Sequence, residues 1–148
     1  MRVYIDTSIV GGCFDDEFSE ESKALFEMAK RGKITLLISN ILADELSIAP
    51  KRVQNVITGL PQGSFEIIHE NEDSRRLRDQ YLNAGIVGAT HTNDAHHVAI
   101  ATVSGADMIV SWNFKHIVHY KKIRQFNNVN TQSGYDEIEI YSPLEVIQ

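Results

Sequence analysis

The chain has 148 residues, of which 43% are hydrophobic and 23% are charged, as in an ordinary globular protein, and we expect a single domain over residues 1–148. The formal net charge of −6 argues against a protein that coats nucleic acid through its overall electric field. It does not exclude a nuclease, because a metal site is built from local acids that make the total charge more negative.

The first half of the chain alternates apolar runs with amphipathic segments. The stretch Arg2–Ser8 indicates a buried strand that stops at Asp6, and the two glycines at 11 and 12 then suggest a turn. A helix is expected from Ser19 to a stop at Gly32. The elements expected after it are a strand over 34–38, helices over 41–47 and 51–60, and a strand over 65–68.

The second half continues the alternation. A charged helix is expected over 72–84, then a loop, then a helix that begins near Asn93 and is apolar nearly all round, so that it should be buried. The remaining expected elements are a strand over 108–111, a basic helix over 114–124, a polar loop over 127–134 and a strand over 138–141. Strands that alternate with helices predict an α/β protein whose parallel sheet is covered on both faces.

A cytoplasmic location is the expected one. Cys13 is the single cysteine, so no intrachain disulfide is possible, which fits a reducing compartment. The sequence contains no apolar run of about 18 residues and no signal-peptide pattern at its start. We therefore expect no membrane partner.

Three acids stand where a plain surface acid is not expected. Asp6 ends the first strand, Glu45 lies on a short apolar helix, and Asp94 stands in the first turn of the helix expected to be buried. Strand ends and helix starts share one edge of a parallel sheet, so Asp6 and Asp94 should lie at the same edge, whereas the spacing leaves the direction of Glu45 open. If the three converge, a hard cation such as Mg²⁺ would compensate their repulsion. The alternative is that they are a turn former, a helix acid and a helix cap.

Carboxylates that hold such a cation suit phosphodiester hydrolysis. A phosphatase that uses a strand-end aspartate as its nucleophile is another reading of Asp6. Such enzymes need a second aspartate two residues later, and Ser8 occupies that place, so we disfavour it.

Four segments together resemble the PIN-domain family, and most closely the VapC-type toxins of bacterial toxin–antitoxin pairs. They are Tyr4–Ser8, Ala43–Leu46, Asn93–Ala101 and Gly105–Ile117. The resemblance covers nearly the whole chain and keeps the order of the family's motifs. It implies a three-layer α/β/α domain with a central, mainly parallel sheet, and a Mg²⁺- or Mn²⁺-dependent endoribonuclease site.

The resemblance also implies roles for individual residues. Asp6, Glu45 and Asp94 match the family's first three acids, the metal ligands, and Ser8 matches an assisting hydroxyl. The family's fourth acid commonly follows the fourth strand, where this chain has Asn113 at the end of the triplet Ser111-Trp112-Asn113. Asn113 is a neutral ligand at best, so the site has one negative charge fewer than a four-acid site.

The family's members often form homodimers and are inhibited by a cognate antitoxin, so the resemblance implies an RNA substrate, an antitoxin partner and a homodimer. Asn113 motivates an alternative from a different class, a PIN-like binding module with little or no hydrolysis that acts through a protein or RNA partner.

Several further residues admit two interpretations. Lys115 and His116 open a basic stretch directly after Asn113, which either grips RNA phosphates or is a solvated helix face. Trp112 either stacks on a base or packs in the core. The histidines invite a zinc site, but one cysteine and the pair His116-x-x-His119 make a poor zinc signature, so we disfavour zinc.

Overall fold

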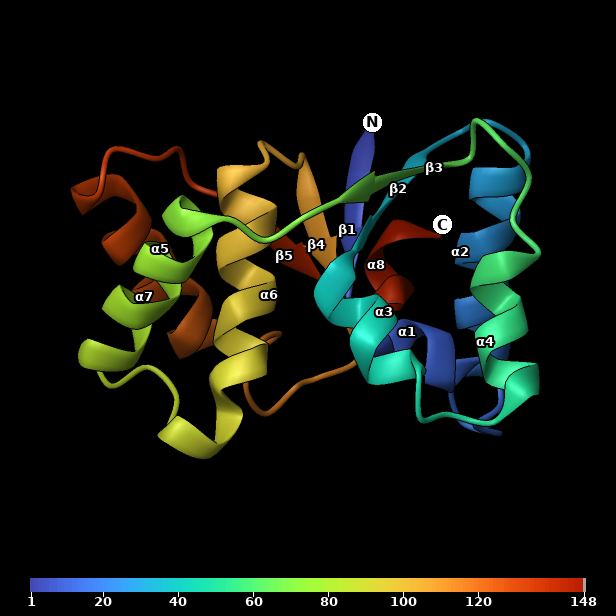
Figure 1. The fold of residues 1–148 in the computed structure, drawn as a ribbon, viewed down its shortest axis with the longest axis horizontal. Helices are drawn as coiled ribbons and strands as arrows, with labels where there is room; N and C mark the ends of the chain where they lie inside the picture. Colours follow the sequence, from blue (N-terminus) through green and yellow to red (C-terminus); the bar gives the residue numbers. More distant parts are fainter. Residues whose placement is uncertain (148) are drawn as a thin grey trace.

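In the computed structural model, which describes residues 1–147, a parallel sheet of five strands has the order β3-β2-β1-β4-β5 (Figure 1). Gln148, the last residue of the expected domain, lies outside the described residues. The strands are β1 (Arg2–Ile5), β2 (Thr35–Ser39), β3 (Phe65–Ile68), β4 (Met108–Val110) and β5 (Glu139–Tyr141).

Strand β1 lies at the centre of the sheet, paired with β2 on one side and β4 on the other. Its side chains alternate between two hydrophobic cores: Val3 and Ile5 belong to one, and Tyr4 belongs to the other. All three are fully buried, as expected for a strand that is covered on both faces. The chain leaves β1 for β2 on one side and reaches β4 on the other, so the carboxyl end of β1 is a topological switch point, where open α/β sheets bind their ligands.

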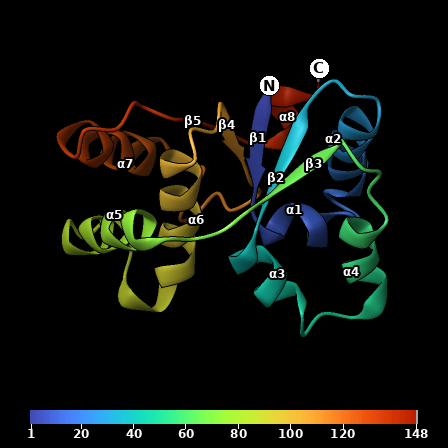
Figure 2. The same cartoon turned by 45° about the horizontal axis from the view of Figure 1, so that its top comes forward.

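Helices cover both faces of the sheet, which confirms the three-layer α/β/α architecture (Figures 1 and 2). The core that contains Val3 is covered by α1 (Thr7–Gly12), α2 (Ser19–Lys30), α3 (Asn40–Leu46), α4 (Lys51–Thr58) and α8 (Pro143–Val146). The core that contains Tyr4 is covered by α5 (Glu72–Asn83), α6 (Thr92–Val103) and α7 (Tyr120–Gln132). The short 3₁₀ helix η1 (Ala89–His91) leads directly into α6.

The expected turn at Gly11 and Gly12 is wrong, because both residues lie in helix α1. A Cβ atom at Gly12 would lie 2.5 Å from Ser22 Oγ and 2.8 Å from Trp112 Nε1, which donates a hydrogen bond to that hydroxyl. Position 12 therefore has no room for a side chain, because three segments meet there. Trp112 is buried and stacks on Phe18, which is the packing role of its two interpretations.

The expected helix over 114–124 and the expected loop over 127–134 are also wrong in their bounds. Residues after Asn113 form a turn, in which the Asn113 carbonyl accepts from the amides of Ile117 and Val118, and α7 runs from Tyr120 to Gln132. The end of α7 is polar and still helical, because its asparagine side chains form hydrogen bonds inside the protein. Asn130 is fully buried and its Oδ1 accepts from the Tyr81 hydroxyl, while Asn127 bonds the backbone of Ile138.

Within residues 1–147, none of the helices combines the length and the apolar character needed to cross a membrane.

Candidate functional site

Asp6 follows the last residue of β1 and is only 4% exposed. Its backbone is extended, and its carbonyl accepts from the amide of Ile9 in the first turn of α1. Each of its carboxylate oxygens accepts one serine hydroxyl: Oδ1 from Ser8 at 2.6 Å and Oδ2 from Ser111 at 2.7 Å. The central strand thus ends in a buried carboxylate that is held in one orientation.

The two serines are fixed by the backbone that follows β4. Ser8 Oγ accepts from the amide of Trp112, and Ser111 Oγ accepts from the amide of Asn113, both at 2.9 Å. Each hydroxyl therefore donates a hydrogen bond to Asp6 and accepts one from a backbone amide of the segment after β4. Ser8 and Ser111, the expected assisting residues, lie against Asp6 and tie the ends of β1 and β4 together.

Glu45 faces the same edge of the sheet. Its Oε1 accepts from Thr7 Oγ1 at 2.9 Å and lies 2.6 Å from His97 Nε2. Thr7 follows Asp6 directly, and His97 lies one helical turn after Asp94 on α6. The carboxyl group whose direction the spacing left open is therefore turned toward the segments that carry Asp6 and Asp94.

Behind Glu45 runs a buried chain of polar contacts. His97 Nδ1 lies 2.5 Å from the hydroxyl of Tyr4, and that hydroxyl donates to Ser39 Oγ at 2.9 Å. Ser39 also caps α3, the helix that carries Glu45, by accepting from the amide of Leu42. From the sequence, Thr7 is expected to offer a hydroxyl beside Asp6 and Ser39 to cap the next helix, but the contacts of Thr7 with Glu45 and of Ser39 with Tyr4 were not predicted. Apolar periodicity marks Tyr4 as a core residue and does not reveal the hydrogen bond from its hydroxyl.

The pKa values of the two carboxyl groups move in opposite directions. Burial raises the pKa of Asp6, and the negative charge of Asp94 raises it further, against the charge of His97 and the two serine hydrogen bonds. Burial also acts to raise the pKa of Glu45, but the hydrogen bond and charge of His97 and the bond from Thr7 outweigh it, so the pKa of Glu45 is lowered. Glu45 is thus held as a carboxylate, whereas burial makes a negative charge on Asp6 costly in free energy.

Asp94 lies in the first turn of α6, where the helix dipole favours a negative charge. Helix α6 begins at Thr92, one residue before Asn93, where the sequence predicts its start, and His91 is the N-cap residue. His91 Nδ1 lies 3.4 Å from Asp94 Oδ2, and the rings of His91 and His116 are 3.7 Å apart. The ligand atoms of His91, Asp94 and His116 all lie within 4.8 Å of one another.

Asn113 stands where the resemblance expects a fourth acid, and its amide oxygen already has a partner. Asn113 Oδ1 accepts from the amide of His116 at 2.9 Å, which orders the turn after β4. Lys115 is exposed on that turn, next to the carboxyl edge of the sheet. Burial and the neighbouring His91 lower the pKa of His116, which favours its neutral form.

The acids at this edge fit a divalent cation. Among the described residues, no lysine or arginine forms an ion pair with Asp6, Glu45 or Asp94. The three carboxylates do not gather within 4.8 Å of one another. Mg²⁺ usually binds through one or two carboxylates and keeps several waters, so this wider spacing suits an ion held partly through water.

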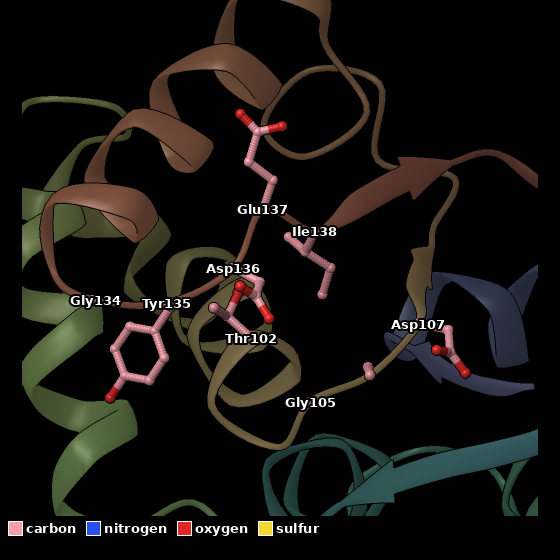
Figure 3. Close-up of a pocket in the computed structure, with 9 residues that line it drawn as sticks. Thr102, Gly105, Asp107, Gly134, Tyr135, Asp136, Glu137 and Ile138 are labelled. Atoms are coloured by element: carbon pink, nitrogen blue, oxygen red, sulfur yellow. The ribbon is translucent and has the colours of Figure 1, made fainter.

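A hollow of about 410 Å³ lies at the opposite, amino edge of the sheet, and its lining includes the acids Asp107, Asp136 and Glu137 (Figure 3). Asp107 accepts from the amide of Arg2, at the start of β1. Ligands of open parallel sheets bind at the carboxyl edge, and the polar cluster around Asp6 is there. We therefore place the candidate site at the edge that carries Asp6.

A family model and several solved structures agree with this architecture. The family model described as "PIN domain" matches residues 2–115, which include Asp6, Glu45, Asp94 and Asn113. Among curated proteins, the sequence search finds no match.

Solved structures share the whole fold at low sequence identity. A chain of VapBC2 from Rickettsia felis, bound to a DNA fragment from its promoter, is 18% identical with a TM-score of 0.63, and the match covers 96% of this chain and 98% of that one. A chain of DNA-bound VapBC from Salmonella typhimurium is 17% identical with a TM-score of 0.59, covering 97% and 98%. A chain of FitAcB from Neisseria gonorrhoeae is 16% identical with a TM-score of 0.58, covering 96% and 98%.

Proposed function

The chain belongs to the PIN-domain family, a family of nucleases that generally depend on divalent metals, and from that premise we propose that it is a Mg²⁺- or Mn²⁺-dependent endoribonuclease, the toxin of a toxin–antitoxin pair. One observation carries the proposal. Asp6 is a buried carboxylate at the switch point of the sheet, oriented by two serines and unpaired with any described lysine or arginine. A negative charge kept there at a cost in free energy is what a cation site needs.

Each side chain has a part in this proposal. Asp6, Glu45 and Asp94 bind the metal, and Asn113 stands beside them as a neutral group. A divalent cation held by these residues would supply an acidified water for attack on phosphorus and a positive charge for the leaving oxygen. His97 and Thr7 hold Glu45 as a carboxylate, Ser8 and Ser111 orient Asp6, and Lys115 and His116 bind the RNA backbone.

The test is cleavage of a panel of structured RNAs with Mg²⁺, with Mn²⁺ and with EDTA. Asp6→Asn preserves the size of the side chain and removes its charge, and should lower metal-dependent cleavage by at least about 100-fold. Asp44→Asn is the matched control, because Asp44 is exposed on the same helix as Glu45 and should leave the rate unchanged. Equal cleavage by Asp6→Asn and the parent, or full cleavage in EDTA, would overturn the proposal.

The binding module remains a second candidate, and the contact of Asn113 favours it. The Asn113 amide oxygen bonds the backbone of His116 and is not free for a metal. Asp forms the same type of turn, so Asn113→Asp should fold and add one negative charge. A parent that binds RNA without metal-dependent cleavage, together with an Asn113→Asp variant that cleaves, would identify the module; cleavage by the parent rejects it.

The proposed partners follow from the toxin assignment. We expect an RNA substrate, a cognate antitoxin that covers the site, a homodimer and a cytoplasmic location. The solved neighbours include DNA-bound VapBC complexes, which supports the search for an antitoxin. The direct check is co-purification of the chain with the product of a small adjacent reading frame. Suppression of the metal-dependent cleavage by that product would support the pairing, and undiminished cleavage would reject it.

A further inference from the structure

His91, Asp94 and His116 form a cluster that has only Asp94 in common with the three-acid site. Within residues 1–147 they are the only group of three or more histidine, cysteine or acidic side chains whose ligand atoms all lie within 4.8 Å of one another. Two imidazoles and a carboxylate are a donor set for borderline transition metals, as in zinc sites that keep open positions, whereas Mg²⁺ prefers oxygen ligands alone.

The three ligands come from two segments of the chain, and the backbone of each segment is fixed independently of the other. His91 is the last residue of η1 and the N-cap residue of α6, so that it and Asp94 are three residues apart across the first turn. His116 stands on the turn after β4, where Asn113 accepts from its amide and the next residue, Ile117, is fully buried. The backbones that carry the three ligands are therefore ordered before any ion binds.

One side-chain atom of the cluster is buried without a hydrogen-bond partner within residues 1–147. The rings of His91 and His116 lie 3.7 Å apart with a tilt of 30°, and Nδ1 of His116 is buried and has no hydrogen-bond partner in the described structure. A buried polar atom without a partner is costly, and a metal ion is one means of satisfying it. His91 and Asp94 are 40% and 23% exposed, which leaves a face of the cluster open to solvent and to entry of an ion.

We propose that His91, Asp94 and His116 bind a divalent transition-metal ion of the Zn²⁺ class, distinct in its ligands from the proposed magnesium site but sharing Asp94 with it. A zinc–nitrogen distance of about 2.0–2.1 Å puts two ligand atoms of a tetrahedral site roughly 3.3 Å apart, and the three ligand atoms here already lie within 4.8 Å of one another. Because Asp94 is shared, an ion held by the two histidines competes with the proposed magnesium site for this carboxylate. Zn²⁺ therefore acts as an inhibitor of any metal-dependent activity of the three-acid site.

The zinc signature sought in the sequence, His116-x-x-His119, is not the pair that meets. His119 is exposed and extended at the start of α7, and the partner of His116 is His91, 25 residues earlier in the chain. No local spacing rule finds such a pair.

The test uses untagged protein and Co²⁺ as a spectroscopic probe for Zn²⁺. The parent should bind one Co²⁺ with visible absorption of nitrogen-ligated cobalt, and Zn²⁺ should displace it. His91→Ala and His116→Ala should each weaken Co²⁺ binding at least about 10-fold. His69→Ala and His119→Ala, at exposed histidines outside the cluster, should bind Co²⁺ as the parent does.

Two results would overturn the proposal. One is parent-like Co²⁺ binding by both His91→Ala and His116→Ala, with folding checked by circular dichroism. The other is loss of the Co²⁺ spectrum in Asp6→Asn, which keeps all three proposed ligands. Because Asp6→Asn removes the magnesium site and the histidine variants remove the zinc-class site, failure of one assignment is distinguished from failure of the other.

Discussion

The free-energy cost at this site is concentrated in one side chain, Asp6. Burial raises its pKa, and Ser8, Ser111 and the charge of His97 offset that effect only in part. A group whose pKa is raised by folding stabilises the fold below its unfolded pKa and loses that contribution as the pH rises through its folded pKa. Without metal, ionisation of Asp6 as the pH rises therefore destabilises the protein.

Asp6→Asn should consequently raise the free energy of unfolding in EDTA at pH 7, by about 1 kcal/mol. The two serine hydroxyls can rotate to suit an amide, so the substitution removes the charge without opening a cavity. The gain should shrink as the pH is lowered toward the ordinary carboxyl pKa, because the folded parent then takes up a proton at Asp6. Urea unfolding at pH 7 and at lower pH measures it. An Asp6→Asn variant less stable than the parent at pH 7 contradicts the assigned cost.

At the scale of elements, the site depends on how closely α1 approaches its neighbours. Helix α1 begins directly after Asp6, and its Gly12 lies against the Trp112–Ser22 hydrogen bond that links the chain after β4 to α2. Thr7, in the first turn of α1, bonds Glu45 on α3. A displacement of α1 thus moves two of the proposed metal ligands together.

Two glycine substitutions on α1 separate helix propensity from packing. Gly12→Ala should destabilise the protein by about 1–3 kcal/mol, because its Cβ would force apart Ser22 and Trp112. Gly11→Ala is the matched control: its Cβ meets nothing within 4 Å, and the better helix former should stabilise by up to about 1 kcal/mol. Thermal unfolding of both variants gives the comparison. Equal stability of the two variants would show that the close contact at Gly12 does not restrict the size of the side chain at that position.

The success of prediction from sequence differed between elements for physical reasons. The apolar runs that became β2 and β4 and the nearly all-apolar α6 were identified because burial on both sides leaves a continuous pattern. Helix α1 was missed because a glycine needed for close packing looks like a turn residue. The polar end of α7 was missed because Asn127 and Asn130 are bonded inside the protein.

Within the candidate site, the position of each acid along its strand or helix could be predicted from the sequence. The direction in which the Glu45 side chain points could not. An acid at a strand end and an acid in the first turn of a helix mark the carboxyl edge of a sheet, which is where Asp6 and Asp94 lie. Glu45 is turned by Thr7 and His97, from two other elements. Contacts between residues so far apart, like that of His91 with His116, leave no periodic signal in the sequence.

At the scale of the whole molecule, His96 links the layer of helices on the Tyr4 side to the end of β3. It is 3% exposed, its Nε2 has no hydrogen-bond partner among the described residues, and Glu70 lies 3.8 Å from that atom. Burial, with a further contribution from Arg78, lowers the pKa of His96 from 6.5 to about 4. The folded protein therefore resists protonation of a group that the unfolded chain protonates readily.

The stability of the protein should accordingly fall as the pH is lowered from 6.5 to about 4, by about 2–3 kcal/mol from this group. The unfolded chain binds a proton in that window and the folded chain does not. His96→Gln cannot titrate and should flatten this part of the pH profile, whereas His69→Gln, at an exposed position, should not. A profile for His96→Gln as steep as that of the parent contradicts the assignment.

The central claim is that Asp6, Glu45 and Asp94 hold one divalent cation at the carboxyl edge of the sheet. The most direct measurement is an anomalous difference map from crystals grown in Mn²⁺, collected at the manganese absorption edge. The account predicts a peak between the carboxylates of Asp6 and Asp94 on the side faced by Glu45, absent in Asp6→Asn. A parent crystal with no peak there, or with manganese bound only elsewhere, would contradict it.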